Sequence, residues 1–221
     1  MKVNGKHLSD IQIIENLTNI LVGGFETTAS ALGYCLLALA MHPEIQEKCF
    51  DELIKKFPDE KMELTPENIK KLTYLDMVIK ETMRLFPPIP VSARQNMSDL
   101  DVGDYVFPKD TILVLNIFKL HRDKELWGDD CLQFNPEHFS PENIAKRHIF
   151  AFLPFTAGNR NCIGGRYALT SLKVGLAHIL RQYKFSTPLK MNDLVFKLSI
   201  TLKITNGFMV QLSKRTKDEH V

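Results

Sequence analysis

The chain has 221 residues, about the length of one to one and a half typical domains. Hydrophobic residues make up 44% of it and charged residues 24%, which is the composition of an ordinary globular protein. The formal net charge of +2 is small, and no basic run is interleaved with aromatic residues. The sequence therefore predicts no nucleic acid binding.

The four cysteines lie far apart in the chain, at Cys35, Cys49, Cys131 and Cys162. No two of them form a CxxC pair, so we expect no zinc site. Their wide and irregular spacing also argues against a disulfide scaffold and indicates reduced thiols. Three of them are interpreted as small, buried apolar residues.

The N-terminal segment is polar and lacks the apolar region that signal peptides carry. The longest apolar stretch runs from Ala29 to Met41, which is shorter than the about 20 residues that a membrane-spanning helix requires. The sequence therefore predicts neither a signal peptide nor a spanning helix, and we do not expect an integral membrane protein.

Two apolar stripes with helical spacing follow one another near the N-terminus. The first begins at Ile11, behind a polar cap at 9–10, and the second resumes at Ala29 and ends before Pro43. Between them lies the sequence GGFETT, at 23–28. Each glycine costs a helix about 1 kcal/mol, and threonines that bond back to carbonyls bend it. The pattern fits one bent helix with a polar groove or, alternatively, two helices joined at the glycines.

Caps, prolines and apolar periodicity predict further helices at 43–57, 73–85 and 163–183. At 65–67 a cap residue followed by proline predicts the start of another helical turn. The segment 121–147 is polar and irregular, and it is long enough to suggest a function.

Runs rich in β-forming residues predict short strands at 104–107 and 111–115. Near the C-terminus, 197–204 and 208–212 flank Asn206-Gly207, which is typical of a hairpin, and 214–221 is expected to fray. Strands do not alternate regularly with helices. The predicted fold class is therefore mainly α with a minor β-sheet portion, rather than a doubly wound sheet.

An irregular loop with a lone cysteine leads into the helix predicted after it. The start of a helix offers unpaired N–H groups and a positive potential, which favour a thiolate at Cys162. Gly158 and Gly164 would let a flat cofactor approach the backbone closely. Arg160 could reach an anionic group of that ligand, and Phe155 could pack beside the sulfur. The alternative is a core cysteine with an exposed arginine nearby.

Glu81 and Arg84 are three residues apart on a predicted helix, so their side chains meet on one face. Apolar neighbours at 78–79 and 85 indicate a half-buried pair, and buried charges must be paired. An ordinary surface salt bridge is the alternative.

The segment from Phe155 to Gly164 resembles the cysteine-loop signature FxxGxRxCxG of the cytochrome P450 superfamily, with all five fixed positions present. The residues from Glu81 to Arg84 are similar to its ExxR motif. The sequence FNPEHF at 134–139 resembles the meander segment FxPERF, and GGFETT resembles the oxygen-groove motif. The four motifs occur in the family's order, and the details most resemble animal microsomal members of the family-4 type.

The resemblance implies that residues 1–221 form a single, partial haem-thiolate monooxygenase domain, which is the truncated C-terminal part of the cytochrome P450 fold. It divides the chain into an oxygen-groove helix at about 10–41, an ExxR helix at about 73–85, a meander at about 121–147, and the cysteine loop 155–164 with the helix that follows it.

The resemblance also implies roles toward haem b, iron protoporphyrin IX. Cys162 would be the thiolate ligand of the iron, and Arg160 and Arg94 would bind the haem propionates; for Arg94, an ordinary surface arginine is the alternative. Phe155, Gly158 and Gly164 would surround the cofactor.

Two further groups of residues take roles by the same resemblance. Thr27 and Glu26 would serve catalysis by delivering protons during dioxygen activation. Glu81 and Arg84 would form a structural triad with the meander residue His138, which stands where the family usually has arginine. A histidine is largely neutral near pH 7, so we expect weaker electrostatics in this triad.

The implied reaction inserts one oxygen atom of O2 into a small, apolar organic substrate, with Ile89, Pro90, Val91 and 200–203 lining its pocket. Electrons would come from NADPH–cytochrome P450 reductase, docked on the cysteine side. Lys146, Arg147 and Lys173 offer it a positive face there, or are simply solvated. The implied location is the cytosolic face of the endoplasmic reticulum membrane, with membrane contact only through an N-terminal anchor outside this chain.

Two other functions stay open at this point. A truncated, non-catalytic haem-binding or vestigial protein would keep Cys162 but lack a closed pocket. A helical interaction module would bind no cofactor at all.

Overall fold

The computed structural model describes residues 2–3, 6–59 and 62–216. Its longest element is helix α1, Asp10–Met41, which starts at a capping box between Ser9 and Gln12. The helix is continuous through Gly23 and Gly24, so the alternative of two separate helices is wrong. Both predicted apolar stripes therefore lie on one helix, the first of them exposed and the second buried.

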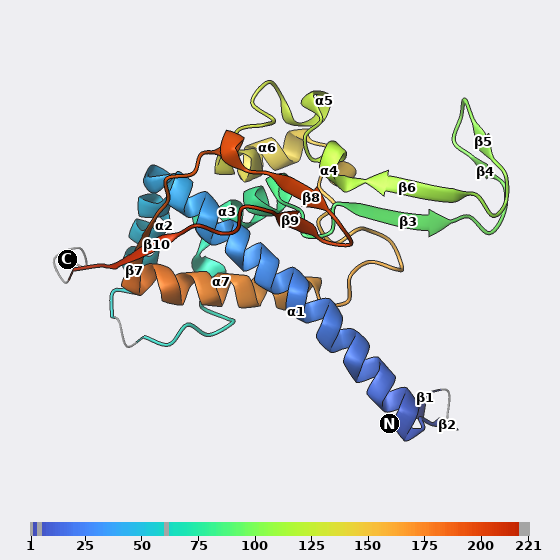
Figure 1. The fold of residues 1–221 in the computed structure, drawn as a ribbon, viewed down its shortest axis with the longest axis horizontal. Helices are drawn as coiled ribbons and strands as arrows, with labels where there is room; N and C mark the ends of the chain where they lie inside the picture. Colours follow the sequence, from blue (N-terminus) through green and yellow to red (C-terminus); the bar gives the residue numbers. More distant parts are fainter. Residues whose placement is uncertain (1, 4–5, 60–61, 217–221) are drawn as a thin grey trace.

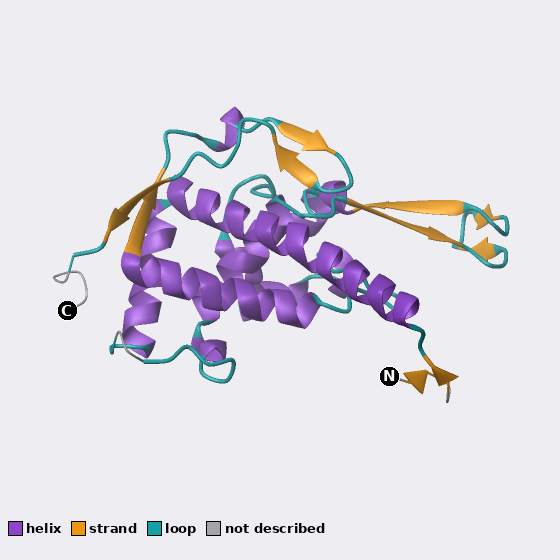
Figure 2. Cartoon of the chain, turned by 60° about the horizontal axis from the view of Figure 1, so that its bottom comes forward, coloured by secondary structure: helices purple, strands orange, loops and turns teal. Residues whose placement is uncertain are grey.

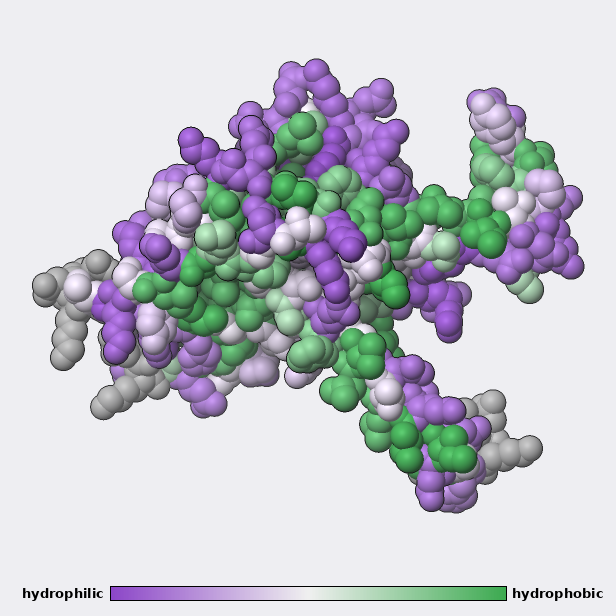
Figure 3. Space-filling model, in the orientation of Figure 1, coloured by the Kyte–Doolittle hydropathy of each residue, from purple (hydrophilic) through white to green (hydrophobic). Residues whose placement is uncertain are grey.

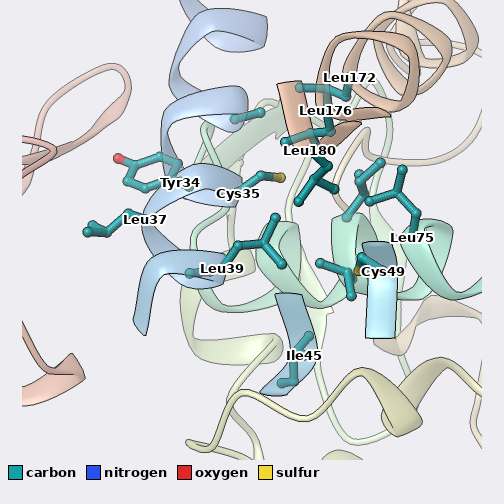
Figure 4. Packing of buried hydrophobic residues seen from close by; sticks show 14 of the residues in the cluster. Tyr34, Cys35, Leu37, Leu39, Ile45, Cys49, Leu75, Leu172, Leu176 and Leu180 are labelled. Carbon is teal, nitrogen blue, oxygen red and sulfur yellow. The ribbon is translucent and has the colours of Figure 1, made fainter. Parts of the chain in front are cut away.

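The second half of α1 packs with three other helices, which are α2 (Pro43–Lys56), α3 (Thr73–Leu85) and α7 (Gly165–Gln182) (Figure 1). Leu172, Leu176 and Leu180 repeat every four residues along one face of α7 and point toward α1 (Figure 4). They meet Cys35 and Leu39 there. This helical core carries the loops that hold the predicted site residues.

Two polar side chains, one of them fully buried, fix the ends of these helices. The carboxylate of Glu52 accepts hydrogen bonds from the backbone N–H groups of Thr73, Tyr74 and Leu75, which caps the start of α3. Gln46 of α2 is fully buried, and its amide bonds the backbone of Leu39 and Phe185. α2 is therefore tied to α1, to α3 and to the strand that follows α7.

The first half of α1 projects away from the core (Figures 1 and 2). Seven apolar residues on it have between 61% and 74% of their surface exposed, namely Ile11, Ile14, Leu17, Ile20, Leu21, Val22 and Phe25. By length and composition α1 could cross a membrane, and 22% of its most apolar window is buried. This corrects the expectation that no apolar segment is long enough to span a membrane, because α1 joins both apolar stripes in one helix. Core helices of soluble proteins pass the same test.

A second projection is an antiparallel pair of strands, β3 (Val91–Gln95) and β6 (Ile112–Asn116), with a small hairpin of β4 (Leu100–Asp101) and β5 (Val106–Phe107) at its tip (Figure 2). The strand predicted at 104–107 is shorter than expected. Gly103, at a φ of 92°, makes the tight turn that delays pairing until Val106.

The C-terminal strands pair differently from the prediction. β8 (Phe196–Leu198) pairs with β9 (Leu202–Ile204), while β10 (Gln211–Lys214) pairs with β7 (Tyr183–Ser186). The hairpin turn thus lies at 199–201, and a hairpin across Asn206-Gly207 is wrong. The Asn206 side chain instead bonds Asp193 O and Val195 N, which closes the base of the β8–β9 hairpin.

The remaining elements are short: β1 (Lys2–Val3), β2 (Lys6–His7), η1 (Ile69–Lys71), α4 (Ile117–Leu120), α5 (Lys124–Trp127), η2 (Pro136–Phe139), α6 (Pro141–Lys146), η3 (Ile149–Ala151) and η4 (Met191–Asp193). No helix begins at 65–67, where Thr65 instead caps a turn through Asn68 N. We expected 214–221 to fray, and this is wrong at Arg215, whose side chain is buried. Residues 217–221 lie outside the described residues.

Candidate functional site

The loop before α7 holds Cys162 outside the helix. The backbone N–H of Cys162 donates to the carbonyl of Phe155 at 3.0 Å, which closes the loop. Thr156 and Gly158 inside it have positive φ angles of 58° and 81°. α7 starts only at Gly165, so the expectation of a helix from Ile163 is corrected by two residues. Cys162 is exposed, whereas the other three cysteines are buried, as expected.

The aromatic ring of Phe155 packs on the first turn of α7. A Cβ atom added at Gly165 would lie 3.1 Å from that ring, and one added at Gly164 would lie 4.0 Å from the sulfur of Cys162. Gly165, at the start of α7, is therefore a residue of the site that the sequence reasoning missed. The signal for it was present, since a second glycine beside Gly164 at a helix start indicates a close approach of another group.

We expect Gly165→Ala to destabilise the protein by about 1–3 kcal/mol, because the added methyl group overpacks against Phe155. The matched control is Gly175→Ala in the same helix, where a Cβ would meet no atom within 4 Å. That control should stabilise the protein by up to about 1 kcal/mol through helix propensity alone. Urea unfolding of both variants makes the comparison, and equal stabilisation of the two would contradict the packing argument.

Two arginines lie beside the cysteine loop. The guanidinium of Arg94, on β3, donates to the carbonyl of Arg160 at 3.1 Å and to the carbonyl of Ala93 at 2.8 Å. Both arginines are exposed, and among the described residues neither forms an ion pair with a carboxylate. The structure thus brings the predicted residues Arg94, Arg160 and Cys162 to one place, with two positive charges still available to an anionic ligand.

Glu81 and Arg84 form a fully buried ion pair on α3, which excludes the surface salt bridge. Arg84 makes two bonds to Glu81, each at 2.7 Å, and donates to three backbone carbonyls, those of His121, Cys131 and Gln133. Glu81 also accepts from the N–H of Asn135 at 2.8 Å. The pair therefore fixes the meander segment against α3.

His121 extends this network to the cysteine loop. The backbone N–H of Leu153, two residues before Phe155, donates to His121 Nε2 at 2.9 Å. His121 is fully buried, and burial, aided by the charge of Arg84, lowers its pKa to about 3, so it is neutral. Sequence reasoning missed this residue, because nothing local in the sequence shows that the histidine faces a distant loop.

His138 completes the group around Glu81. Its Nδ1 lies 3.1 Å from Glu81 Oε1, and its Nε2 lies 3.2 Å from Asp130 Oδ1. Burial alone lowers the pKa of His138, but the hydrogen bond and charge of Glu81, with a bond from Asp130, outweigh burial and the charge of Arg84. The net effect raises the pKa of His138. We had expected His138 to be largely neutral. The raised pKa favours its charged form instead, because two carboxylates face the ring.

Stability should therefore depend on the protonation of His138. A raised pKa in the folded state means that this contribution is complete below the ordinary value of about 6.5 and is lost as the pH rises through the folded pKa. In His138→Arg the charge is permanent, so we expect the wild type to lose stability relative to this variant as the pH rises above about 6.5. Urea unfolding across that range tests this, and a constant difference would contradict it.

The predicted basic docking face is only partly present. Arg147 donates to the carbonyls of Leu126 and His138, and its guanidinium lies 3.8 Å from the centre of the Trp127 ring. Lys173 pairs with Asp76 at 2.6 Å, and its side chain is 12% exposed. Of the three residues, only Lys146 is exposed, so they do not form the proposed positive surface.

The oxygen-groove residues lie where α1 leaves the core. The hydroxyl of Thr27 donates to the carbonyl of Gly23 at 2.7 Å, the back-bonding expected of a threonine in this stretch. Glu26 Oε1 accepts from the hydroxyl of Thr201 at 2.9 Å and pairs with Lys203 at 3.3 Å. The Thr201 hydrogen bond and then Lys203 lower the pKa of Glu26.

The cysteine loop and α1 bound an open hollow. On the face shown in Figure 3, apolar surface follows the projecting half of α1 and the β3–β6 arm, and the molecule recedes between them. The loop that precedes α7 lies at the base of this hollow (Figure 1). An exposed thiol, open glycine positions and two arginines in contact thus lie together at the cysteine loop, and this combination suits a flat ligand with anionic groups.

Comparison with known proteins agrees with this arrangement. The family model described as "Cytochrome P450" matches residues 1–212. The chain is 44% identical over 206 residues to "Probable cytochrome P450 313a4" of Drosophila melanogaster, covering 92% of the chain and 42% of that relative. It is 39% identical over 215 residues to "Cytochrome P450 4V2" of Mus musculus, covering 97% of the chain and 41% of that relative.

Solved structures give the same result for the fold. The heme domain of cytochrome P450DA superposes with a TM-score of 0.88 at 28% identity, over 99% of this chain and 48% of that one. A mutant of that heme domain gives 0.88 at 29% identity, over 98% and 47%. The chain thus spans less than half the length of the relatives it matches.

Over part of its length the fold is that of a cytochrome P450 heme domain, and the chain belongs to the cytochrome P450 superfamily, a family of haem monooxygenases. Within the superfamily it is family-4-like, since its relatives include "Cytochrome P450 4V2" and "Probable cytochrome P450 4ac1". The predicted fold class, mainly α with a minor β-sheet portion and covering part of the cytochrome P450 fold, is confirmed.

Proposed function

We propose that this chain supplies the haem b site of a monooxygenase that inserts one oxygen atom of O2 into a small, apolar organic substrate. The observation that carries the proposal is the exposed Cys162, next to two arginines that pair with no carboxylate in the part of the chain that the structure describes. When bound, a haem with a thiolate ligand supplies the chemistry of O–O bond cleavage.

Each residue of the loop takes a role toward the cofactor. Cys162 holds the metal, and the guanidinium groups of Arg94 and Arg160 bind the propionates through charge-assisted hydrogen bonds. Gly158, at a φ of 81°, and Gly164 keep side-chain atoms away from the cofactor's face. Phe155, which packs on Gly165, would limit the access of water to the sulfur when the cofactor is bound.

Protons reach the reaction through α1. Thr27 offers a hydroxyl that already bonds to the helix backbone, and Glu26 is a carboxylate one residue before it. Substrate would contact the apolar residues of this hollow, together with Ile89, Pro90 and Val91 before and on β3.

Electrons would come from an NADPH-dependent reductase that docks near the cysteine. Since Arg147 and Lys173 are engaged within the protein, exposed residues such as Lys146 and Ile163 are better candidates for that surface. By the family resemblance, we propose the cytosolic face of the endoplasmic reticulum membrane as its location.

Two measurements on the purified protein test the proposal. Carbon monoxide difference spectroscopy of the reduced protein should show haem bound through a thiolate, and NADPH-dependent turnover should appear with added reductase. A thiolate spectrum without turnover favours the non-catalytic haem-binding alternative. No haem uptake at all would leave the helical interaction module as the remaining function.

A further inference from the structure

The β8–β9 hairpin lies against α1 in a fixed position. The buried hydroxyl of Tyr34, on α1, donates to the carbonyl of Leu202 at 2.6 Å, and the N–H of Leu202 donates to the carbonyl of Pro88 at 2.9 Å. In Figure 4 the hydroxyl of Tyr34 points away from the core. Both backbone groups of one hairpin residue are therefore anchored to neighbouring elements.

Aromatic packing strengthens this anchor. The ring of Phe208, after β9, lies 3.0 Å from where a Cβ of Gly33 would stand, and it meets Tyr34 edge-on at 5.2 Å. Tyr34 in turn stacks on Phe86 at 5.3 Å, and Phe86 contacts Phe196 of β8 at 5.9 Å. The hairpin cannot shift along α1 without breaking this aromatic cluster.

Leu202, the first residue of β9, lies between Thr201, the last residue of the turn, and Lys203 on β9. Its own side chain is buried in the core, whereas the side chains of its two neighbours point toward Glu26 of α1. Both reach Glu26 Oε1, Thr201 through its hydroxyl at 2.9 Å and Lys203 through its ammonium at 3.3 Å. Thr201 is 4% exposed, so its hydroxyl is a buried donor that is satisfied by this carboxylate.

An exposed lysine–glutamate pair alone contributes little and would carry no argument. The contact at Glu26 differs from such a pair in two ways. The buried hydroxyl of Thr201 donates to the same carboxylate oxygen that Lys203 contacts, and the hairpin that carries both residues is anchored. We propose that Thr201 and Lys203 are positioning residues for Glu26, holding its carboxylate in one orientation on α1. This inference rests on the proposed function, in which Glu26 carries protons.

The positioning has a consequence for the reaction. With Oε1 engaged by the hairpin, Oε2 is the oxygen left to exchange protons with water or with Thr27. A carboxylate that turns freely would deliver protons less regularly, and reducing equivalents would then leave as hydrogen peroxide rather than as product. A side chain held in its productive orientation avoids this loss.

The test compares Thr201→Val with Thr201→Ser, and Lys203→Met with Lys203→Arg, in the haem-loaded protein. Valine and methionine remove the donor, while serine and arginine keep one. We expect product formed per NADPH to fall about tenfold in the first of each pair, part of the roughly 100-fold or more that a positioned acid–base group contributes. The second of each pair should stay close to wild type, and in a Glu26→Gln background neither loss should appear.

A second readout needs no cofactor. In the haem-free protein, carbon NMR of labelled glutamate should show the pKa of Glu26 rising toward its ordinary value in Thr201→Val and Lys203→Met. Unchanged titration, or unchanged product yield despite a changed titration, would overturn the inference. A missing thiolate spectrum in the wild type would instead overturn the proposed function, and the titration would still test the contact.

Discussion

Replacing Cys162 by alanine is expected to abolish haem–thiolate ligation and to leave the fold unchanged. The thiol is exposed, and the hydrogen bond that closes the loop uses its backbone N–H rather than its sulfur. The free energy of unfolding of the haem-free protein should therefore change by no more than about 0.5 kcal/mol. The thiolate signature in the reduced carbon monoxide spectrum should disappear completely, because a methyl group cannot bind a metal.

Cys35→Ala is the matched control for this prediction. Cys35 is buried between α1 and α7, and burial raises its pKa to about 12, so it stays a thiol and cannot replace Cys162. Its loss should destabilise the protein by about 1 kcal/mol and leave the spectrum unchanged. A thiolate spectrum that survives in Cys162→Ala, or imidazole-type ligation in the wild type, would refute the assignment.

The sequence predicts best those features that depend on neighbours along the chain. α3 has the predicted bounds, because its apolar periodicity and its proline stop are local signals. The meeting of Glu81 and Arg84 follows from their spacing of three on that helix. The cysteine loop was recognisable for the same reason, since all of its fixed positions lie within ten residues.

Pairing between distant segments could not be predicted. β10 joins β7, more than twenty residues away in the chain, although Asn206-Gly207 offered a local hairpin. Asn206-Gly207 forms no hairpin because the chain already reverses at 199–201. Leu202, the next residue, is anchored there by Tyr34 and Pro88. A turn motif shows where the chain can reverse, but buried contacts decide which strands pair.

The charge state of a residue is equally a property of its distant neighbours. His138 gains its raised pKa from Glu81, 57 residues away, and from Asp130. Arg147 and Lys173 read as surface charges, yet Arg147 stacks on Trp127 and Lys173 pairs with Asp76. Composition and spacing identify such groups, but they do not show which oppositely charged group or aromatic ring each one meets.

Arg84→Met is expected to be among the most damaging substitutions in this chain, at about 3–5 kcal/mol of unfolding free energy. It leaves the buried charge of Glu81 without its partner and removes the donors of three backbone carbonyls, two of them in buried hydrogen bonds. Arg84→Lys should cost nearly as much, because one ammonium cannot reproduce five bonds in a planar fork.

Removing the guanidinium of Arg84 should also loosen the cysteine loop. Arg84 holds the carbonyl of His121, and His121 Nε2 holds the N–H of Leu153 just before that loop. Hydrogen exchange at Leu153 should therefore accelerate in Arg84→Met, and haem affinity should fall, whereas Lys80→Met should change neither. Lys80 pairs with Asp76 on the same helix but is 31% exposed, so its loss should cost at most about 1 kcal/mol. If the two variants proved equally stable in urea, the buried network would not hold the site in place, and the loop would owe its geometry to Phe155 and Gly165 alone.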